Sequence, residues 1–207
     1  MANLLSRRDE ALALRLAAGQ PESAGEFNDF LERVRADVVQ AALAEEPVRR
    51  RLEGVRHRVV AVDYREDKPA GDADGPVRLA EVFIYDYDSD VLVVAVLHLG
   101  EGELAELDER AGSPPISAEE LDEARRILRD QPEIARELRD DGVPMVAFPT
   151  PGYAFTGHRD RHRGCTVFAG TAAGGEVMAT VDLSAGSIVP DEDLPAELLR
   201  FSRARVE

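Results

Sequence analysis

The chain contains an internal repeat, in which residues 36–104 recur in the same order at residues 121–188. The run Val93–Leu99 aligns with Val177–Leu183, and the offset between the copies stays at 84 to 86 residues. The small changes in offset fall in turns, where insertions are best tolerated. Further matching pairs are Val60–Val62 with Val146–Phe148 and Gly102 with Gly186. A repeat of this length constrains the architecture before any single motif does.

The first copy begins with helices and continues with strands. Apolar residues spaced mostly by three and four predict one buried face on a long helix. They are Phe27, Phe30, Leu31, Val34, Val38, Ala42 and Leu43. Pro47 breaks that helix and opens a short second one, which Gly54 ends. The following patterns and turns predict strands over Val59–Tyr64, Leu79–Asp88, Val91–Leu99 and near Leu104.

The second copy repeats this order. Ser117 and Glu120 form a capping box that predicts a helix start, and Pro132 restarts a helix further on. Strands are expected over Val143–Phe148, Cys165–Ala169, Val177–Leu183 and Ser187–Val189. The segment 149–164 is an irregular insert, and the stretch from Phe148 to Phe155 has no counterpart in the first copy.

These patterns predict an α+β fold with two tandem units, each a helix packed on an antiparallel sheet of about four strands. The expected domains are an N-terminal helical extension at 1–22, a first repeat at 23–110 and a second repeat at 111–207. The sequence predicts a short amphipathic helix over Ser6–Ala18 in this extension.

The net charge of the chain limits the kinds of partner that it can bind. The formal net charge is −16 at pH 7. A phosphate backbone has to be met by clustered Lys and Arg, so no nucleic-acid partner is expected. The charge also disfavours an anionic membrane surface, whereas it attracts a basic peptide or a cationic ligand.

Cysteine usage and the N-terminus point to a compartment. The one cysteine, Cys165, excludes an internal disulfide and is typical of a reducing environment. The N-terminal residues have no apolar stretch without charges, so neither a secretion signal nor a membrane anchor is expected. Arginine outnumbers lysine 24 to 1, a bias that GC-rich bacterial genomes produce. These features predict a cytoplasmic protein of a bacterium.

Three segments carry a resemblance to a known family. They are PPISAEELDEARRIL at 114–128, VMATVDLSAGSIV at 177–189 and AEVFIYDYDSDVLVVAVLHLGEGEL at 80–104. Over residues 24–190 the chain resembles the small cystatin-like domains that stand in tandem before the catalytic domain of copper amine oxidases. The resemblance implies two cystatin-like units.

The chain departs from that family in its chemistry. The family uses a quinone made from the tyrosine of an Asn-Tyr motif and three copper-ligating histidines. Here Asn3 precedes Leu and Asn28 precedes Asp, and there are four scattered histidines. The resemblance therefore implies only the non-catalytic part, and no catalytic residue of the family is carried over.

His158, His162 and Cys165 form the densest group of metal-ligand residue types, and their spacing suits one zinc shell. The arginines that alternate with them would repel a cation. The repeat also places Cys165 over Ala80, where a small buried side chain is expected. A basic loop that leads into a core strand is the alternative that we favour, so no cofactor is expected.

The insert also predicts a recognition loop. Arg159, Arg161 and Arg163 form a basic island suited to carboxylate or phosphate, and Tyr153 and Phe155 precede it. This loop would bind an acidic peptide or a carboxylate ligand. Ordinary solvated charges that pair with nearby carboxylates are the alternative.

Tyr85 and Tyr87 share one face of the strand Leu79–Asp88 and are further candidates for contact with a partner. The carboxylates that alternate with them, up to Asp90, could bind calcium. However, the twelve-residue loop with its glycine is missing, and a hairpin turn is expected instead.

The resulting hypothesis is a non-catalytic accessory module that binds a peptide or a partner protein and assists a modifying enzyme of a biosynthetic pathway. Strand addition at a sheet edge would be its mode of binding. Two alternatives remain open. One is a small enzyme with His98, His158 or His162 as acid or base, and the other is a structural subunit of a larger complex. Open sheets also favour a homodimer.

Overall fold

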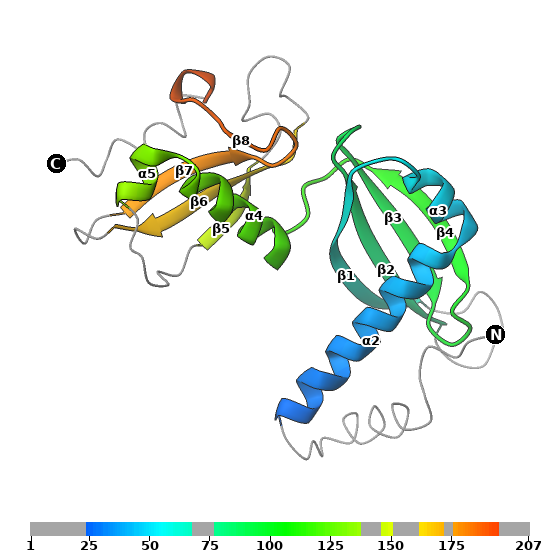
Figure 1. Cartoon of the computed structure of the whole chain (residues 1–207). Helices are drawn as coiled ribbons and strands as arrows, with labels where there is room; N and C mark the ends of the chain where they lie inside the picture. Colours follow the sequence, from blue (N-terminus) through cyan, green and yellow to red (C-terminus); the bar gives the residue numbers. More distant parts are fainter. Residues whose placement is uncertain (1–23, 68–76, 138–145, 151–161, 172–175, 195–207) are drawn as a thin grey trace. The chain divides into compact units, whose positions relative to one another are not determined.

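The computed structural model describes residues 24–67, 77–137, 146–150, 162–171 and 176–194. The helix expected over Ser6–Ala18 lies outside the described residues. The α+β fold is confirmed: two units, each made of helices and a four-stranded antiparallel sheet, follow one another along the chain (Figure 1).

The first unit contains two helices and a sheet with the strand order β1-β2-β3-β4. Its elements are α2 (Ala24–Ala44), α3 (Glu46–Leu52), β1 (His57–Asp67), β2 (Val77–Asp86), β3 (Val91–His98) and β4 (Leu104–Arg110). Pro47 stands in the first turn of α3, where its missing N–H costs nothing. Gly54 follows that helix with a φ of 76°, as expected for the glycine that ends it.

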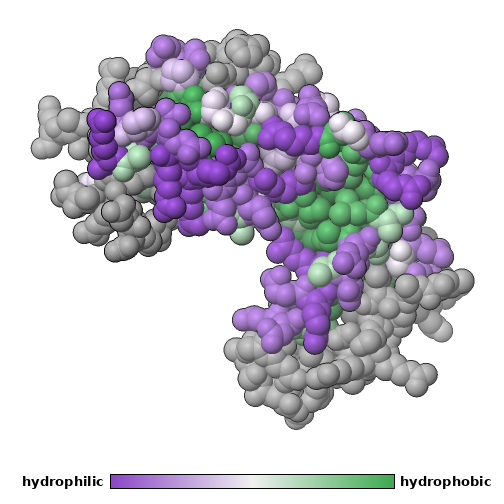
Figure 2. Space-filling view, in the orientation of Figure 1, coloured by the Kyte–Doolittle hydropathy of each residue, from purple (hydrophilic) through white to green (hydrophobic). Residues whose placement is uncertain are grey.

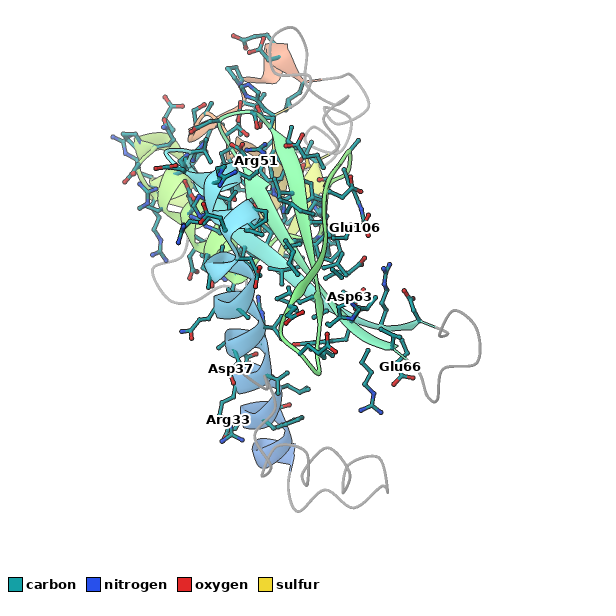
Figure 3. The ribbon with its side chains drawn as sticks, turned by 90° about the vertical axis from the view of Figure 1, so that its right-hand side faces the viewer. Arg33, Asp37, Arg51, Asp63, Glu66 and Glu106 are labelled. Atoms are coloured by element: carbon teal, nitrogen blue, oxygen red, sulfur yellow. The ribbon has the colours of Figure 1, made fainter. Side chains whose placement is uncertain are left out.

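The apolar stripe of α2 is confirmed in part. Phe30, Val34, Val38 and Ala42 are buried, at intervals of four residues. Leu31 was expected on the same face, but its side chain is exposed, because one residue further along an α-helix turns the side chain by about 100°. Figure 3 shows charged side chains such as Asp37 projecting from the exposed side of α2.

The second unit has the strand order β5-β6-β7-β8. Its elements are α4 (Ala118–Arg129), α5 (Pro132–Glu137), β5 (Val146–Thr150), β6 (Gly164–Gly170), β7 (Glu176–Asp182), β8 (Ser187–Ile188) and the 3₁₀ turn Asp191–Asp193. The capping box is confirmed: Ser117 Oγ accepts from the backbone N–H of Glu120 at 3.2 Å, and Glu120 Oε2 accepts from that of Ser117 at 2.8 Å.

The register of the second sheet separates its two faces. Cys165 pairs with Val181 and Val167 pairs with Ala179, and all four are buried together with the apolar stripe of α4. The opposite face carries the alternate residues, among them Phe148 and Thr166, which pair with each other.

The bounds predicted for the irregular insert, 149–164, are wrong at both ends. Pro149 and Thr150 continue β5, and Gly164 begins β6. The proline is tolerated because β5 stands at the edge of its sheet, where one row of its backbone groups has no neighbour among the described strands.

The contacts divide the chain into two compact units: Met1–Ile84 with Val93–Arg110, and Tyr85–Leu92 with Ala111–Glu207. The tip of the β2–β3 hairpin therefore belongs to the second unit. The domain boundaries expected at 23 and 111 stay a prediction. Among the described residues, no helix is long and apolar enough to cross a membrane.

Candidate functional site

The structure describes only part of the recognition loop that the sequence predicts. Tyr153, Phe155, His158, Arg159 and Arg161 lie outside the described residues, so their roles stay predictions. The candidates that the structure describes all lie in the second unit: His162, Arg163, Cys165, Tyr85 and Tyr87.

Arg163 is buried and makes ionic and hydrogen bonds through its whole guanidinium group. Its Nη2 donates to Glu120 Oε2 at 2.8 Å, and its Nε donates to the other oxygen of the same carboxylate. The backbone carbonyls of Pro114 and Pro115 accept further bonds at 3.1 and 3.0 Å. Arg163 thus stabilises the interior of the unit, and its side chain is withdrawn from any exposed basic surface.

Both tyrosines are also buried, around this ion pair. The hydroxyl of Tyr87 donates to Glu120 Oε1 at 2.7 Å. The guanidinium carbon of Arg163 lies 5.2 Å from the centre of the Tyr85 ring, which itself meets Tyr87 edge to face at 5.1 Å. Burial raises the pKa of Tyr85, and the carboxylate of Asp90 raises it further. These side chains pack inside the unit instead of facing a partner.

Glu120 and Arg163 both keep their charge. Burial alone would raise the pKa of Glu120, but the hydrogen bonds and charge of Arg163 hold it below its usual value. Burial alone would lower the pKa of Arg163, but its hydrogen bonds with Glu120 raise it. The backbone N–H of Ser117 and the Tyr87 hydroxyl also lower the pKa of Glu120. The cluster is therefore a fully engaged buried ion pair, an arrangement typical of structure.

His162 joins a second group of polar side chains. Its Nδ1 lies 2.8 Å from Asp182 Oδ2, and its Nε2 lies 3.8 Å from Asp90 Oδ2. Asp182 also accepts from the backbone N–H of Ala185 at 2.8 Å. Asp90, a non-glycine residue with a φ of 54°, accepts from the hydroxyl of Ser184. Asp182, the last residue of β7, is thus hydrogen-bonded through both of its carboxylate oxygens.

The zinc site is not tested by the structure, since His158 lies outside the described residues. In the described part of the chain, no group of three or more His, Cys, Asp or Glu side chains could hold a metal ion. Cys165 lies in the core, where burial raises its pKa to about 12. The small buried side chain expected at this position is confirmed.

Exposed apolar side chains gather on β5. The exposed fractions of Val146 and Phe148 are 49% and 55%, and the two side chains lie on the same face of the strand. The ring of Phe148 meets that of Phe168, one strand further in, at 6.1 Å. Within the described residues, an apolar surface thus reaches β5, the edge strand of the second sheet, and the sequence-based prediction missed it.

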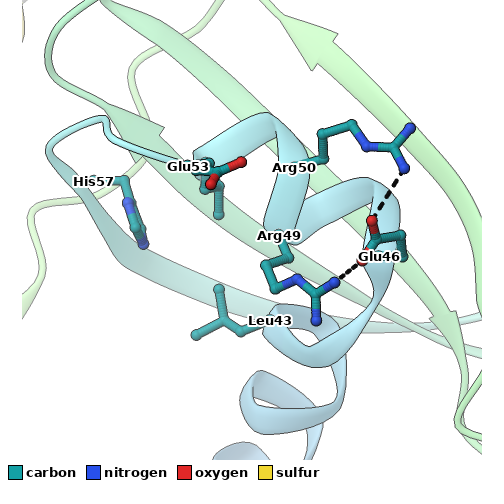
Figure 4. A pocket seen from close by; sticks show the side chains of 7 residues that line it. Leu43, Glu46, Arg49, Arg50, Glu53 and His57 are labelled. Carbon is teal, nitrogen blue, oxygen red and sulfur yellow. Dashed lines mark hydrogen bonds and ion pairs between the residues drawn. The ribbon is translucent and has the colours of Figure 1, made fainter.

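A pocket of about 400 Å³ lies in the first unit, at the turn between α3 and β1 (Figure 4). It is lined by Leu43, Glu46, Arg49, Arg50, Leu52, Glu53 and His57. Over the sheet of the same unit, Figure 2 shows apolar residues gathered with hydrophilic residues around them. The sequence contains a feature that could have indicated the pocket: five of the 24 arginines lie between residues 49 and 58, against one glutamate.

The fold and these surfaces define a tandem α+β protein of two helix-on-sheet units. No family model and no curated protein matches the chain. Among solved structures, a copper-containing benzylamine oxidase from Hansenula polymorpha is similar, at 15% identity and a TM-score of 0.47. The match covers 76% of this chain and 29% of that one, so the chain spans under a third of the oxidase's length. Such a match does not assign the chain to the family, and the cystatin-like units stay a prediction.

Proposed function

We propose that the chain is a non-catalytic binding module that holds an extended peptide segment of a partner protein against β5. The exposure of Val146 and Phe148 on this edge strand is the observation that carries the proposal. Its role is accessory: the chain presents its partner to a modifying enzyme.

Strand addition fits the geometry of β5. An added strand would take its hydrogen bonds from the unpaired edge, while its alternate side chains contact Val146 and Phe148. Burying the exposed half of each of these side chains would stabilise the complex by about 1 kcal/mol before the cost of association. Pro149 has no N–H, so pairing is expected along the first residues of the strand.

Several buried side chains with catalytic potential are engaged inside the second unit, which supports a binding role. Tyr87 and Arg163 both donate hydrogen bonds to Glu120, and Cys165 lies in the core. Burial also raises the pKa of Cys165 to about 12, which disfavours the thiolate that a cysteine nucleophile needs. The resemblance to the non-catalytic domains of amine oxidases points the same way.

The proposal is tested with peptides selected against the full chain from a phage-displayed random library. Calorimetry then compares the wild type with Val146→Ser/Phe148→Ser and with the control Leu31→Ser/Tyr64→Ser. Leu31 and Tyr64 are also large and exposed, both at 41%, but lie in the first unit. The β5 variant should bind selected peptides at least about tenfold more weakly, while the control keeps its affinity. A library that yields no peptide, or equal loss in both variants, would refute the proposal.

A further inference from the structure

The hydrogen bonds of the second sheet reveal in which direction each backbone group of β5 points. In an antiparallel sheet, the N–H and C=O of one residue point to one neighbouring strand, and those of the next residue point to the other side. The N–H of Leu183 donates to the carbonyl of Arg163 at 2.8 Å, and this pair continues the register in which Asp182 faces Gly164. The odd-numbered residues of β6 therefore point to β7, and the even-numbered ones point to β5.

The register of β5 then determines which of its residues point outward. Val146 and Phe148 are opposite even-numbered residues of β6, so their backbone groups point to β6. Those of Ala147 and Pro149 point to the other side, where β5 has no neighbour among the described strands (Figure 1). Pro149 thus stands where its missing N–H takes nothing from the sheet. Within Val146–Thr150, the outer side offers one donor and two acceptors: the N–H and C=O of Ala147 and the C=O of Pro149.

Side chains and charge restrict what can pair with this strand. Neither β5 nor β6 contains a charged residue. The exposed Val146 and Phe148 lie on either side of Ala147, and a charged group placed against them would lose water without gaining a partner. The formal net charge of the chain is −16, so a second copy is repelled, whereas a segment with basic residues outside the contact is attracted.

We propose that the segment held by β5 runs antiparallel to it and carries two apolar residues, one on either side of a residue that faces Ala147, with basic residues beyond them. This inference rests on the function proposed for β5 and specifies the partner. The residue opposite Ala147 exchanges both backbone hydrogen bonds with it. Its two neighbours lie opposite Val146 and Phe148, at about 4.5 Å between Cα atoms, where apolar cross-strand side chains pack closely. The residue opposite Pro149 donates to its carbonyl and receives no bond in return.

The probe is an acetylated, amidated nonapeptide in which Thr-Ile-Thr-Ile-Thr has two lysines at each end. Calorimetry measures its affinity for the full chain, and that of versions that carry one backbone N-methyl group. A methyl group on the central threonine nitrogen removes the donor to Ala147 and should weaken binding at least about tenfold. A methyl group on either isoleucine nitrogen points away from β5 and should change the affinity less than about threefold. A larger loss at the isoleucines would indicate a parallel strand, and equal losses would indicate binding without an added strand. Either result overturns the inference.

A variant of β5 tests the same register from the side of the protein. Pro149→Ala supplies an N–H that points outward, so the nonapeptide should bind about fivefold more tightly. Pro47→Ala, at the start of α3 in the first unit, is the control and should leave the affinity unchanged. Thermal melts report whether each variant is folded. Unchanged or weaker binding by folded Pro149→Ala would contradict the register.

The charge of the peptide and the state of the chain are tested separately. Exchanging the four lysines for glutamates should weaken binding at low salt at least about fivefold, and equal affinity would refute the basic flanks. A dimer of the chain that the nonapeptide dissociates in sedimentation experiments would assign this edge to a second copy and overturn the inference.

Failure of this inference differs from failure of the proposed function. If the nonapeptide does not bind, while peptides selected from the library still require Val146 and Phe148, the partner specified here is wrong and the proposed function holds. A library that yields no peptide refutes both.

Discussion

The carboxylate of Glu120 has two roles. As the N3 residue of α4 it accepts the backbone N–H of Ser117, and its other oxygen accepts from Tyr87 and Arg163. One side chain therefore caps the start of α4 and neutralises a buried cation. Losing it would leave Arg163 charged and without its counter-ion in the interior.

Replacing only one residue of the Glu120–Arg163 pair should strongly destabilise the folded chain. Glu120→Gln or Arg163→Met should lower the free energy of unfolding by about 3–5 kcal/mol, because an uncompensated charge stays buried. Arg125→Met breaks an exposed pair with Asp122 on the same helix and should cost less than about 1 kcal/mol. Urea unfolding followed by circular dichroism measures both. Losses of similar size in the buried and exposed pairs would contradict this account.

The same pair predicts a pH dependence. The pKa of Glu120 is lower in the folded chain than its usual value of 4.5. Its contribution to stability is therefore complete above pH 4.5 and is lost as the pH falls through the folded pKa. The stability difference between wild type and Glu120→Gln should be constant from about pH 7 to 5.5 and shrink below about pH 4.5. A difference that grows on acidification would exclude this linkage.

Local sequence chemistry predicted most of the elements. The capping box, Pro47 and the apolar periods act over a few residues, so helix starts and strand faces could be predicted from them. The pairing of Arg163 with Glu120 joins residues 43 positions apart, so it depends on how the sheet places β6 beside α4. No local pattern indicates it. The exposure of Phe148 was missed for a similar reason, since strand order decides which strand is at an edge.

The turn in the last hairpin of each sheet contains a glycine with a positive φ. Gly102 and Gly186, which match in the repeat, have φ angles of 69° and 66°. Ala at Gly186 would meet no atom within 4 Å, so only backbone strain should oppose it. Gly186→Ala should therefore cost about 1–2 kcal/mol.

Gly100 is the matched control for this strain. It also has open space around its Cα, but it lacks a positive φ. Gly100→Ala should leave the urea midpoint nearly unchanged. Equal shifts of the midpoint in the two variants would rule out strain as the cause.

On the scale of the whole molecule, the two copies in the sequence and the two compact units are not the same division. Residues 85–92 lie in the first copy but belong to the second unit. They bring Tyr87 to Glu120 and Asp90 to His162. A cut between the copies would therefore remove part of the second unit.

This overlap predicts the behaviour of a fragment. Residues 111–207 expressed alone lack the Tyr87 hydroxyl, and a buried polar group left without its partner costs about 1–3 kcal/mol. Amide hydrogen exchange in β6 should be faster in the fragment than in the full chain. Full-length Tyr87→Phe, which removes only the hydroxyl, should show a smaller change in the same direction. Equal exchange in fragment and full chain would show that residues 85–92 add nothing to this unit.

The burial of Cys165 has a practical consequence. Its thiol lies in the core, and its pKa is raised to about 12, so maleimide reagents at neutral pH meet almost no thiolate there. A cysteine introduced at an exposed position becomes the one reactive thiol in the folded chain. The native sequence is thus a ready background for attaching a single fluorophore or spin label, without first replacing its own cysteine.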